Sequence, residues 1–250
     1  MAAGPSGLHS VILYSLFAGV CPLIPVPWVD DFVLARVRRA AFRRLFRQGG
    51  AEPTSFQLAE LTADRSSWLR GCFAGLVLYP IKRIFRKIIF VFTLKDCVDA
   101  ASRTFHQLWL VRHLVADWQA GPAEVAGGVA AFARLKRALD RTLAETDPRP
   151  VEQIFKHAFR QGRKRILQVA AALGRAIRRA RGRKAREEAV DRLVEAAEAR
   201  AAAGAEGVSG EDGTPRDAGV QALVEEVESQ LLVQRGYFEA LERRFLRNLS

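Results

Sequence analysis

The stretch that decides the fold class is VEQIFKHAFRQGRKRILQVAAALGRAIRRARGRKAR, residues 151–186. Its apolar side chains recur every three or four residues, which is the spacing of one face of an α-helix. No acidic residue lies between Glu152 and Glu187, whereas acids resume after Glu187. The stretch predicts one long helix, or two abutting helices, over residues 151–203, with Gly162, Gly174 and Gly182 as candidate interruptions. The apolar line comprises Val151, Phe155, Phe159, Ile166, Val169, Leu173 and Ile177.

Helical spacing continues on both sides of this stretch. Residues 204–219 are rich in Gly, Ser, Asp and Glu, which predicts a disordered linker. Residues 220–250 form a short heptad pattern with Gln234 as its one polar step, and this C-terminal amphipathic helix is expected to dock on the same chain or, alternatively, to self-associate. Residues 1–150 are assigned to a helical domain. The expected fold class is all-α, an irregular bundle of about six or seven helices.

The chain is strongly basic. Its 250 residues include 39 Lys and Arg against 27 Asp and Glu, a net charge of +12. This balance makes a polyanionic partner the default expectation, but it does not choose between lipid headgroups and nucleic acid. Cys21, Cys72 and Cys97 are far apart and have apolar neighbours, so they are interpreted as buried hydrophobic side chains in a reducing compartment.

The first apolar segment, residues 8–28, is nearly uncharged. Pro22, Pro25 and Pro27 interrupt a helix there, and a helix over about residues 8–20 would be roughly 20 Å long, too short to span a bilayer alone. We therefore expect a membrane-dipping or core-buried helix that ends in a proline-rich turn, with a spanning segment as the alternative. No Lys or Arg precedes the apolar run, which argues against a cleaved signal peptide.

Two further segments combine cations with apolar side chains. Asp30 and Asp31 precede a predicted helix over residues 32–47, which carries an arginine stripe, and we interpret the aspartates as its N-terminal cap. Residues 71–94 are apolar but carry four cations on one arc, so they should not span a bilayer. They predict an interfacial helix or, alternatively, an ordinary surface helix packed on a core.

The sequence contains no recognisable catalytic constellation. Residues 95–118 predict a helix with a polar stripe of Asp99, His106, His113 and Asp117, and the last two have the spacing of a metal-binding pair. Two ligands do not complete a metal site, so we expect no metal. Glycine-rich phosphate loops, serine nucleophile elbows and paired Cys or His motifs are absent from the sequence. The expectation is therefore no cofactor and no enzymatic activity, although the sequence leaves activity open.

The run PLIPVPWVDD at residues 22–31, followed by a cationic amphipathic helix, resembles the proline-and-aspartate segment of EcsC-like bacterial proteins. The resemblance covers roughly residues 15–50, and it implies a helical, membrane-associated protein. The glycine-rich surroundings of that family are reduced here, and nothing after residue 50 matches its pattern. No site residues follow from the resemblance.

These patterns favour a non-enzymatic adaptor or scaffold, bound peripherally or by shallow insertion to the cytoplasmic face of a membrane. The alternatives are nucleic-acid binding through residues 156–186 and a structural helical protein without a polyanionic partner. The residues expected to contact lipid phosphates are Arg36, Arg39, Arg43, Arg47, Lys82, Arg83, Arg86, Lys87, Arg160, Arg163, Arg175, Arg178 and Arg179. Those expected to contact acyl chains are Leu16, Phe17, Trp28, Ile81, Ile84, Phe85 and Ile88.

Overall fold

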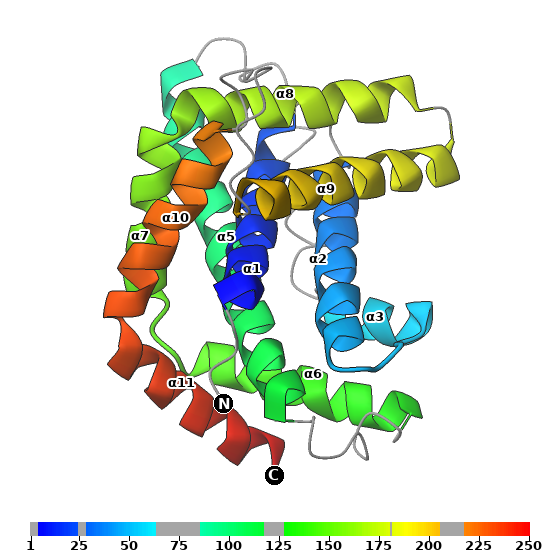
Figure 1. Ribbon diagram of the computed structural model, residues 1–250, viewed down its shortest axis with the longest axis vertical. Coiled ribbons are helices and arrows are strands. Elements are labelled where there is room, and N and C mark those ends of the chain that lie inside the picture. The colour runs from blue at the N-terminus through cyan, green and yellow to red at the C-terminus, as the bar shows by residue number, and fades with distance from the viewer. Residues whose placement is uncertain (1–4, 25–28, 64–85, 118–127, 181, 206–217) are drawn as a thin grey trace.

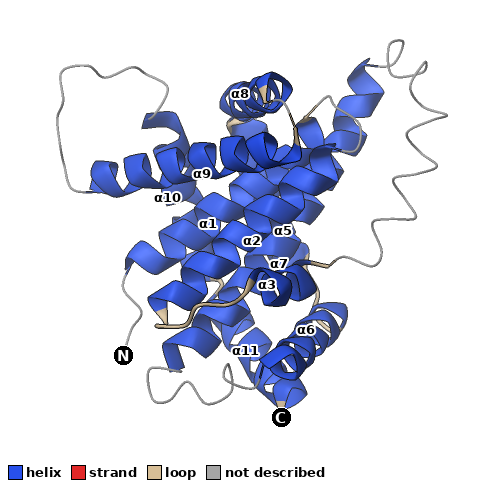
Figure 2. Cartoon of the chain, turned by 90° about the vertical axis from the view of Figure 1, so that its right-hand side faces the viewer, coloured by secondary structure: helices blue, strands red, loops and turns tan. Residues whose placement is uncertain are grey.

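The computed structural model describes residues 5–24, 29–63, 86–117, 128–180, 182–205 and 218–250, and every regular element in these residues is helical (Figure 2). They form ten α-helices and one 3-10 turn, so the all-α class is confirmed, with more helices than the six or seven predicted. The elements are α1 Pro5–Val20, η1 Cys21–Leu23, α2 Val29–Gln48, α3 Ser55–Thr62, α5 Arg86–Asp117, α6 Gly128–Ala144, α7 Arg149–Gln161, α8 Arg163–Arg179, α9 Arg183–Ala205, α10 Ala218–Val233 and α11 Arg235–Leu249.

Local sequence signals explain several of the helix ends. The N-terminus of α3 is closed by a capping box between Thr54 and Gln57, in which each side chain satisfies the backbone N–H of the other residue. The predicted long basic helix divides at Gly162 and again before Gly182, whose φ of +89° is strained for any residue with a Cβ. Gly174 is not an interruption, because it lies inside α8.

Helix α1 occupies the interior of the molecule (Figure 1). Its side chains are apolar on nearly every side, which is the pattern of a helix surrounded by protein. Gly19 lies so close to α5 that a Cβ there would stand 2.8 Å from the carbonyl oxygen of Cys97. Residues 8–20 of the N-terminal apolar segment therefore lie in a core helix, which is followed by the turn containing Pro22. Among the described residues, no helix is both long and apolar enough to cross a membrane.

Helix α5 packs beside α1 and connects the two ends of the molecule (Figure 1). Its Phe105 lies at the centre of an aromatic cluster, with ring centroids 5.8 Å from Phe155 of α7 and 5.8 Å from Phe238 of α11. Trp109, one turn further on, lies 4.5 Å from Phe238. These contacts tie α7 and α11 to α5, since each aromatic side chain buries a large apolar area.

The C-terminal heptad pattern folds back on its own chain. Its polar step, Gln234, is the point at which one predicted helix becomes the two helices α10 and α11. Helix α10 packs on α1 and α7, whereas α11 packs mainly on α6. The buried apolar residues of this region are Leu223, Val224, Val227, Leu231, Phe238, Leu241 and Phe245. The heptad pattern is thus used for docking within the chain, and residues 206–217 of the predicted linker lie outside the described residues.

Candidate functional site

Helix α8 lies across one end of the molecule (Figure 1). Its apolar side chains lie on one side of the helix and its charged side chains lie on the other. Its inner side buries Ile166, Ala170, Leu173, Gly174 and Ile177. Lys164, Arg175, Arg178 and Arg179 are exposed on the outer side, where Arg163 and Arg165 are also exposed. The 17-residue helix is roughly 25 Å long. It therefore presents a cationic face held in place by a buried apolar face.

Neighbouring helices extend this cationic face. Arg160 at the end of α7 is exposed, as are Lys184 and Arg186 at the start of α9. The end of α7, helix α8 and the start of α9 thus bring the described cations of this stretch to the same end of the fold (Figure 1). Leu167 is the large apolar side chain that α8 exposes, at 42 % of its area. We call the outer side of α8 with Arg160, Lys184 and Arg186 the basic ridge.

The arginine stripe of α2 is used differently, because most of its predicted phosphate-binding side chains bond to other parts of the chain. Arg36 forms a two-pronged ion pair with Asp191 of α9, with Nε donating to Oδ1 at 2.8 Å. Arg39 Nε donates to Thr62 Oγ1 at 3.2 Å, and Arg47 Nε lies 3.1 Å from Glu52 Oε1. Arg43 is half-buried. This stripe therefore contributes to intramolecular contacts in the folded chain.

The predicted acyl-chain contacts are not exposed where the structure describes them. Leu16 is 5 % exposed and lies in the core, and Phe17 is half-buried against it. Contact of these side chains with lipid would require α1 to leave the core. Trp28, Ile81, Lys82, Arg83, Ile84 and Phe85 lie outside the described residues, as do the side chains of Arg86, Lys87 and Ile88.

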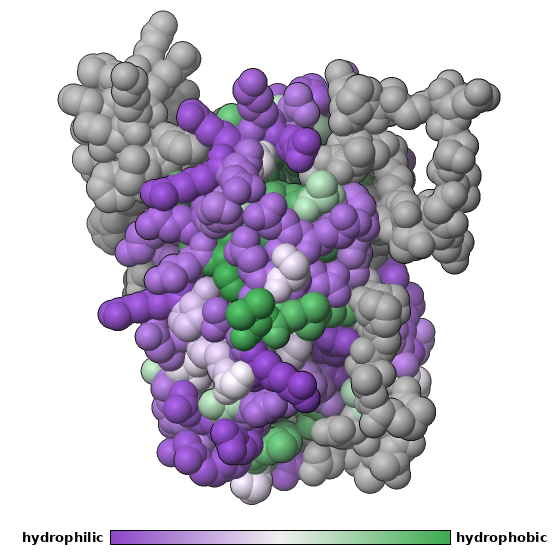
Figure 3. Space-filling model, turned by 60° about the vertical axis from the view of Figure 1, so that its left-hand side comes forward, coloured by the Kyte–Doolittle hydropathy of each residue, from purple (hydrophilic) through white to green (hydrophobic). Residues whose placement is uncertain are grey.

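Hydrophilic side chains predominate on the face shown in Figure 3, with hydrophobic atoms among them at several places. The exposed large hydrophobic residues are Phe56, Leu167, Leu232, Val233 and Leu246. They are spread over α3, α8, α10 and α11, so they do not form a broad apolar face like that of a helix lying in a bilayer interface.

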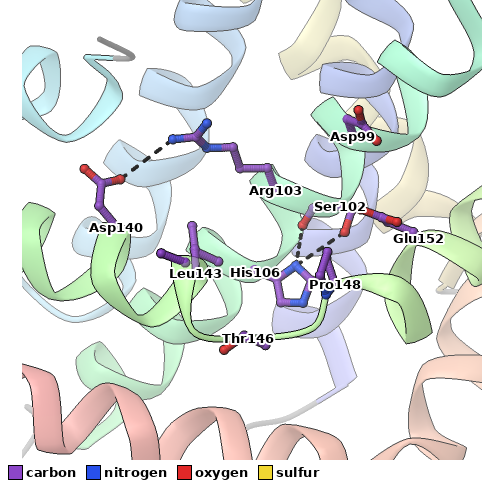
Figure 4. Close-up of a pocket in the computed structure, with 10 residues that line it drawn as sticks. Asp99, Ser102, Arg103, His106, Asp140, Leu143, Thr146, Pro148 and Glu152 are labelled. Atoms are coloured by element: carbon purple, nitrogen blue, oxygen red, sulfur yellow. Dashed lines mark hydrogen bonds and ion pairs between the residues drawn. The ribbon is translucent and has the colours of Figure 1, made fainter. Parts of the chain in front are cut away.

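A pocket of about 390 Å³ lies elsewhere, between α5, α6 and α7. Its charged and hydroxyl-bearing walls come from three helices and the loop between α6 and α7 (Figure 4). Arg103 points toward Asp140 on one side, whereas Asp99 and Glu152 lie on the other side. The lining residues are Asp99, Ser102, Arg103, His106, Asp140, Leu143, Ala144, Thr146, Pro148 and Glu152.

His106 forms the buried end of this pocket and is 1 % exposed. Its Nδ1 lies 2.7 Å from the carbonyl oxygen of Ser102 and therefore donates to it, since a carbonyl only accepts. Its Nε2 lies 2.6 Å from the hydroxyl of Tyr237, which also lies 3.0 Å from the carbonyl oxygen of Asp147. Burial lowers the pKa of His106 to about 4. Because both nitrogens have partners, His106 is not available as a general base for Ser102 or for a bound molecule.

The carboxyl groups on the opposite wall have pKa values above their ordinary range. Burial raises the pKa of Glu152, and the negative charges of Asp99 and Asp147 raise it further. Burial also raises the pKa of Asp99. Lys95 acts in the opposite direction on both carboxyl groups. The pocket is thus a site of acidic character in a basic chain.

The sequence pattern predicted that two of the residues lining this pocket share one side of a helix. The predicted polar stripe of α5 placed Asp99 and His106 on one side, and both line the pocket. His113, from the same stripe, lies 3.0 Å from Glu242 of α11, and the side chain of Asp117 is not described. The contact between His106 and Tyr237 joins residues 131 positions apart, and no local pattern signals it.

The described residues contain no group of three or more His, Cys, Asp or Glu side chains arranged to hold a metal ion. Among the described residues, the candidate sites are the basic ridge on the surface and the pocket between α5, α6 and α7. Comparisons with protein-family models, curated proteins and solved structures find no match for this chain.

Proposed function

We propose that this chain is a non-enzymatic adaptor that docks peripherally on an anionic membrane surface through the basic ridge. The observation that carries the proposal is the exposed set of Lys164, Arg175, Arg178 and Arg179 on a helix whose opposite face is buried. A fixed helix can present several cations to a plane of phosphates without ordering a flexible segment. At an anionic membrane each such cation contributes about 1 kcal/mol.

The position of α8 supports docking rather than insertion. It lies at one end of the molecule, and its outer side carries exposed cations from Lys164 to Arg179. Its exposed apolar side chain, Leu167, can enter the headgroup region only shallowly. Insertion through Leu16 and Phe17 is not part of the proposal, because the core packing of α1 would first have to be broken.

A membrane is favoured over nucleic acid by the composition of the ridge. No aromatic side chain lies among the cations of α8, whereas single-strand binding normally uses aromatic platforms between cations. The resemblance of residues 22–31 to EcsC-like proteins agrees with membrane association, and the cytoplasmic face is the expected side because its lipids are anionic. Nucleic-acid binding is kept as an outcome of the test.

The test is sedimentation of the full chain with lipid vesicles at low and high salt. We expect binding to vesicles containing phosphatidylserine, little binding to pure phosphatidylcholine, and release by salt. The triple variant Arg175→Gln, Arg178→Gln, Arg179→Gln should bind roughly a hundredfold more weakly, since three cations are removed.

The matched control removes three exposed arginines from α11, at the opposite end of the molecule, by Arg235→Gln, Arg243→Gln and Arg247→Gln. It makes the same change in net charge and should weaken binding far less. Equal losses in the two variants would mean that net charge, and not the ridge, attracts the chain. Stronger, salt-sensitive binding to duplex DNA than to vesicles, abolished by the α8 variant, would reassign the ridge to nucleic acid.

A further inference from the structure

We propose that the basic ridge binds an anionic lipid bilayer at two separate points, one at each end of α8, while the uncharged stretch between them contacts the lipid. Two-point binding rests on the proposed membrane docking and extends it to the way in which the lipid is recognised. The partner is then a continuous bilayer surface, because such a surface supplies anionic headgroups at both points.

The exposed side chains of α8 change along the helix from cations to uncharged residues and back to cations. Residues 166–174 contain no charged side chain, and Lys164 and Arg178 lie on either side of them. Successive residues of a helix turn by about 100°, so Lys164, Ala171 and Arg178 point in nearly the same direction. All three are exposed, whereas the opposite side of α8 is buried. The exposed uncharged side chains of the stretch are Leu167, Gln168 and Ala171.

The two groups of cations are far apart. The rise from Lys164 to Arg175 in α8 is roughly 16 Å, at about 1.5 Å per residue. Long side chains of a helix lean toward its N-terminus, so both side chains tilt in the same direction and this separation is retained. One lipid headgroup is too compact to extend over this distance. Separate headgroups are therefore required at the two ends of α8.

Neighbouring helices add cations at both ends of α8. Arg160, at the end of α7, precedes the first group, and Lys184 and Arg186, at the start of α9, follow the second group. All three side chains are exposed. Each end of α8 therefore presents more than one exposed cation, as binding of an anionic headgroup requires.

The fold fixes the distance between the two ends. Ile166, Leu173 and Ile177 anchor the inner side of α8 in the core. At the junction with α7, Gly162 packs so closely on α10 that a Cβ there would stand 3.1 Å from Leu223 Cδ2. The two groups of cations cannot move together around one small anion without breaking this packing. Their fixed spacing favours two linked binding events on one surface.

The uncharged stretch contributes apolar contact between the two points. Leu167 lies in its first half and is 42 % exposed. If headgroups bind both ends of α8, the stretch between them lies at the depth of the headgroups. No charge has to be desolvated there, and Leu167 loses apolar surface that is otherwise in contact with water. Lipid contact at this stretch therefore strengthens binding independently of charge.

The first test compares the two ends of α8 in the partitioning of the full chain onto vesicles of phosphatidylserine and phosphatidylcholine. Arg160→Gln with Lys164→Gln should weaken binding roughly thirtyfold, since two cations are removed. Arg178→Gln with Arg179→Gln should weaken binding to a similar extent. The matched control, Arg235→Gln with Arg243→Gln on α11, makes the same change in net charge and should weaken binding far less.

The second test addresses the uncharged stretch. Leu167→Gln should weaken binding about fivefold at both low and high salt, because apolar contact is not screened. Leu246→Gln on α11, where Leu246 is 52 % exposed, is the matched control and should leave binding unchanged. Ala171→Leu adds apolar area at an exposed position and removes no packing, so it should strengthen binding about threefold.

The outcomes separate two-point binding from membrane docking itself. If the wild-type chain does not bind the vesicles, membrane docking fails and two-point binding fails with it. If the wild type binds and the variant of Arg160 and Lys164 binds equally well, docking stands and two-point binding is wrong. Unchanged binding in both Leu167→Gln and Ala171→Leu would overturn the contact between the uncharged stretch and the lipid.

Discussion

Helices α2 and α8 carry similar arginine stripes, but the two stripes face different surroundings. In α2, Arg36 of the stripe binds Asp191 of α9. Beside the stripe, Arg38 is 4 % exposed and donates to Thr104 of α5. In α8, Arg175 and Arg178 are exposed. An arginine stripe therefore shows where cations lie on a helix, but it does not show whether the fold or an external partner binds them.

The largest predicted effect is a loss in the free energy of unfolding when Arg38, which is buried, is replaced. Arg38→Met should lower the free energy of unfolding by about 2–4 kcal/mol, because it removes a buried charged donor to Thr104 and leaves the site imperfectly filled. Arg178→Met on α8 should change it by less than about 0.5 kcal/mol, as surface substitutions usually do. Urea unfolding at pH 7 measures both. Losses of similar size would remove the distinction between the two helices.

The second prediction extends the comparison to another buried ionisable group, His106. Its pKa of about 4 lies below the ordinary value near 6.5, so the unfolded chain takes up the proton first as the pH falls. The stability that depends on neutral His106 is therefore present above about pH 6.5 and is lost progressively as the pH falls to about 4. Each unit of pKa difference corresponds to about 1.36 kcal/mol, so the loss in the free energy of unfolding should reach up to about 3 kcal/mol.

Unfolding by urea at a series of pH values measures this slope. In His106→Gln the slope between pH 6.5 and 4 should flatten. His157→Gln is the control, because His157 is exposed on α7, and the wild-type slope should persist in it. A slope that survives in the His106 variant would show that other groups cause the pH dependence.

The smallest predicted effect concerns the ion pair that joins α2 to α9. Asp191→Asn should lower the free energy of unfolding by about 0.5–1.5 kcal/mol, since the pair with Arg36 is charge-assisted but partly accessible to solvent. The deficit should shrink at high salt. Glu195→Gln, at an exposed position of α9, should have no comparable effect. If the two variants unfold alike, the pair does not anchor α9.

Local sequence patterns were sufficient for the fold class and for several boundaries. Helical spacing predicted an all-α chain, and the glycines at 162 and 182 were correctly identified as candidate interruptions of the basic stretch. The polar step at Gln234 coincides with the break between α10 and α11, although a single helix was expected there. Such signals act within a few residues, so they can be recognised without knowing what lies nearby in space.

The assembly of the sites depended on tertiary structure. The apolar segment at residues 8–28 had three open interpretations, a membrane-dipping, a core-buried and a spanning helix. Packing of α1 against α5 places its described helix in the core. The stripe on α5 predicted that Asp99 and His106 share a side, but Tyr237 reaches His106 only because α11 folds back across the chain. Sequence periodicity determines which face of each helix is polar, whereas long-range packing decides which polar face meets protein and which meets solvent.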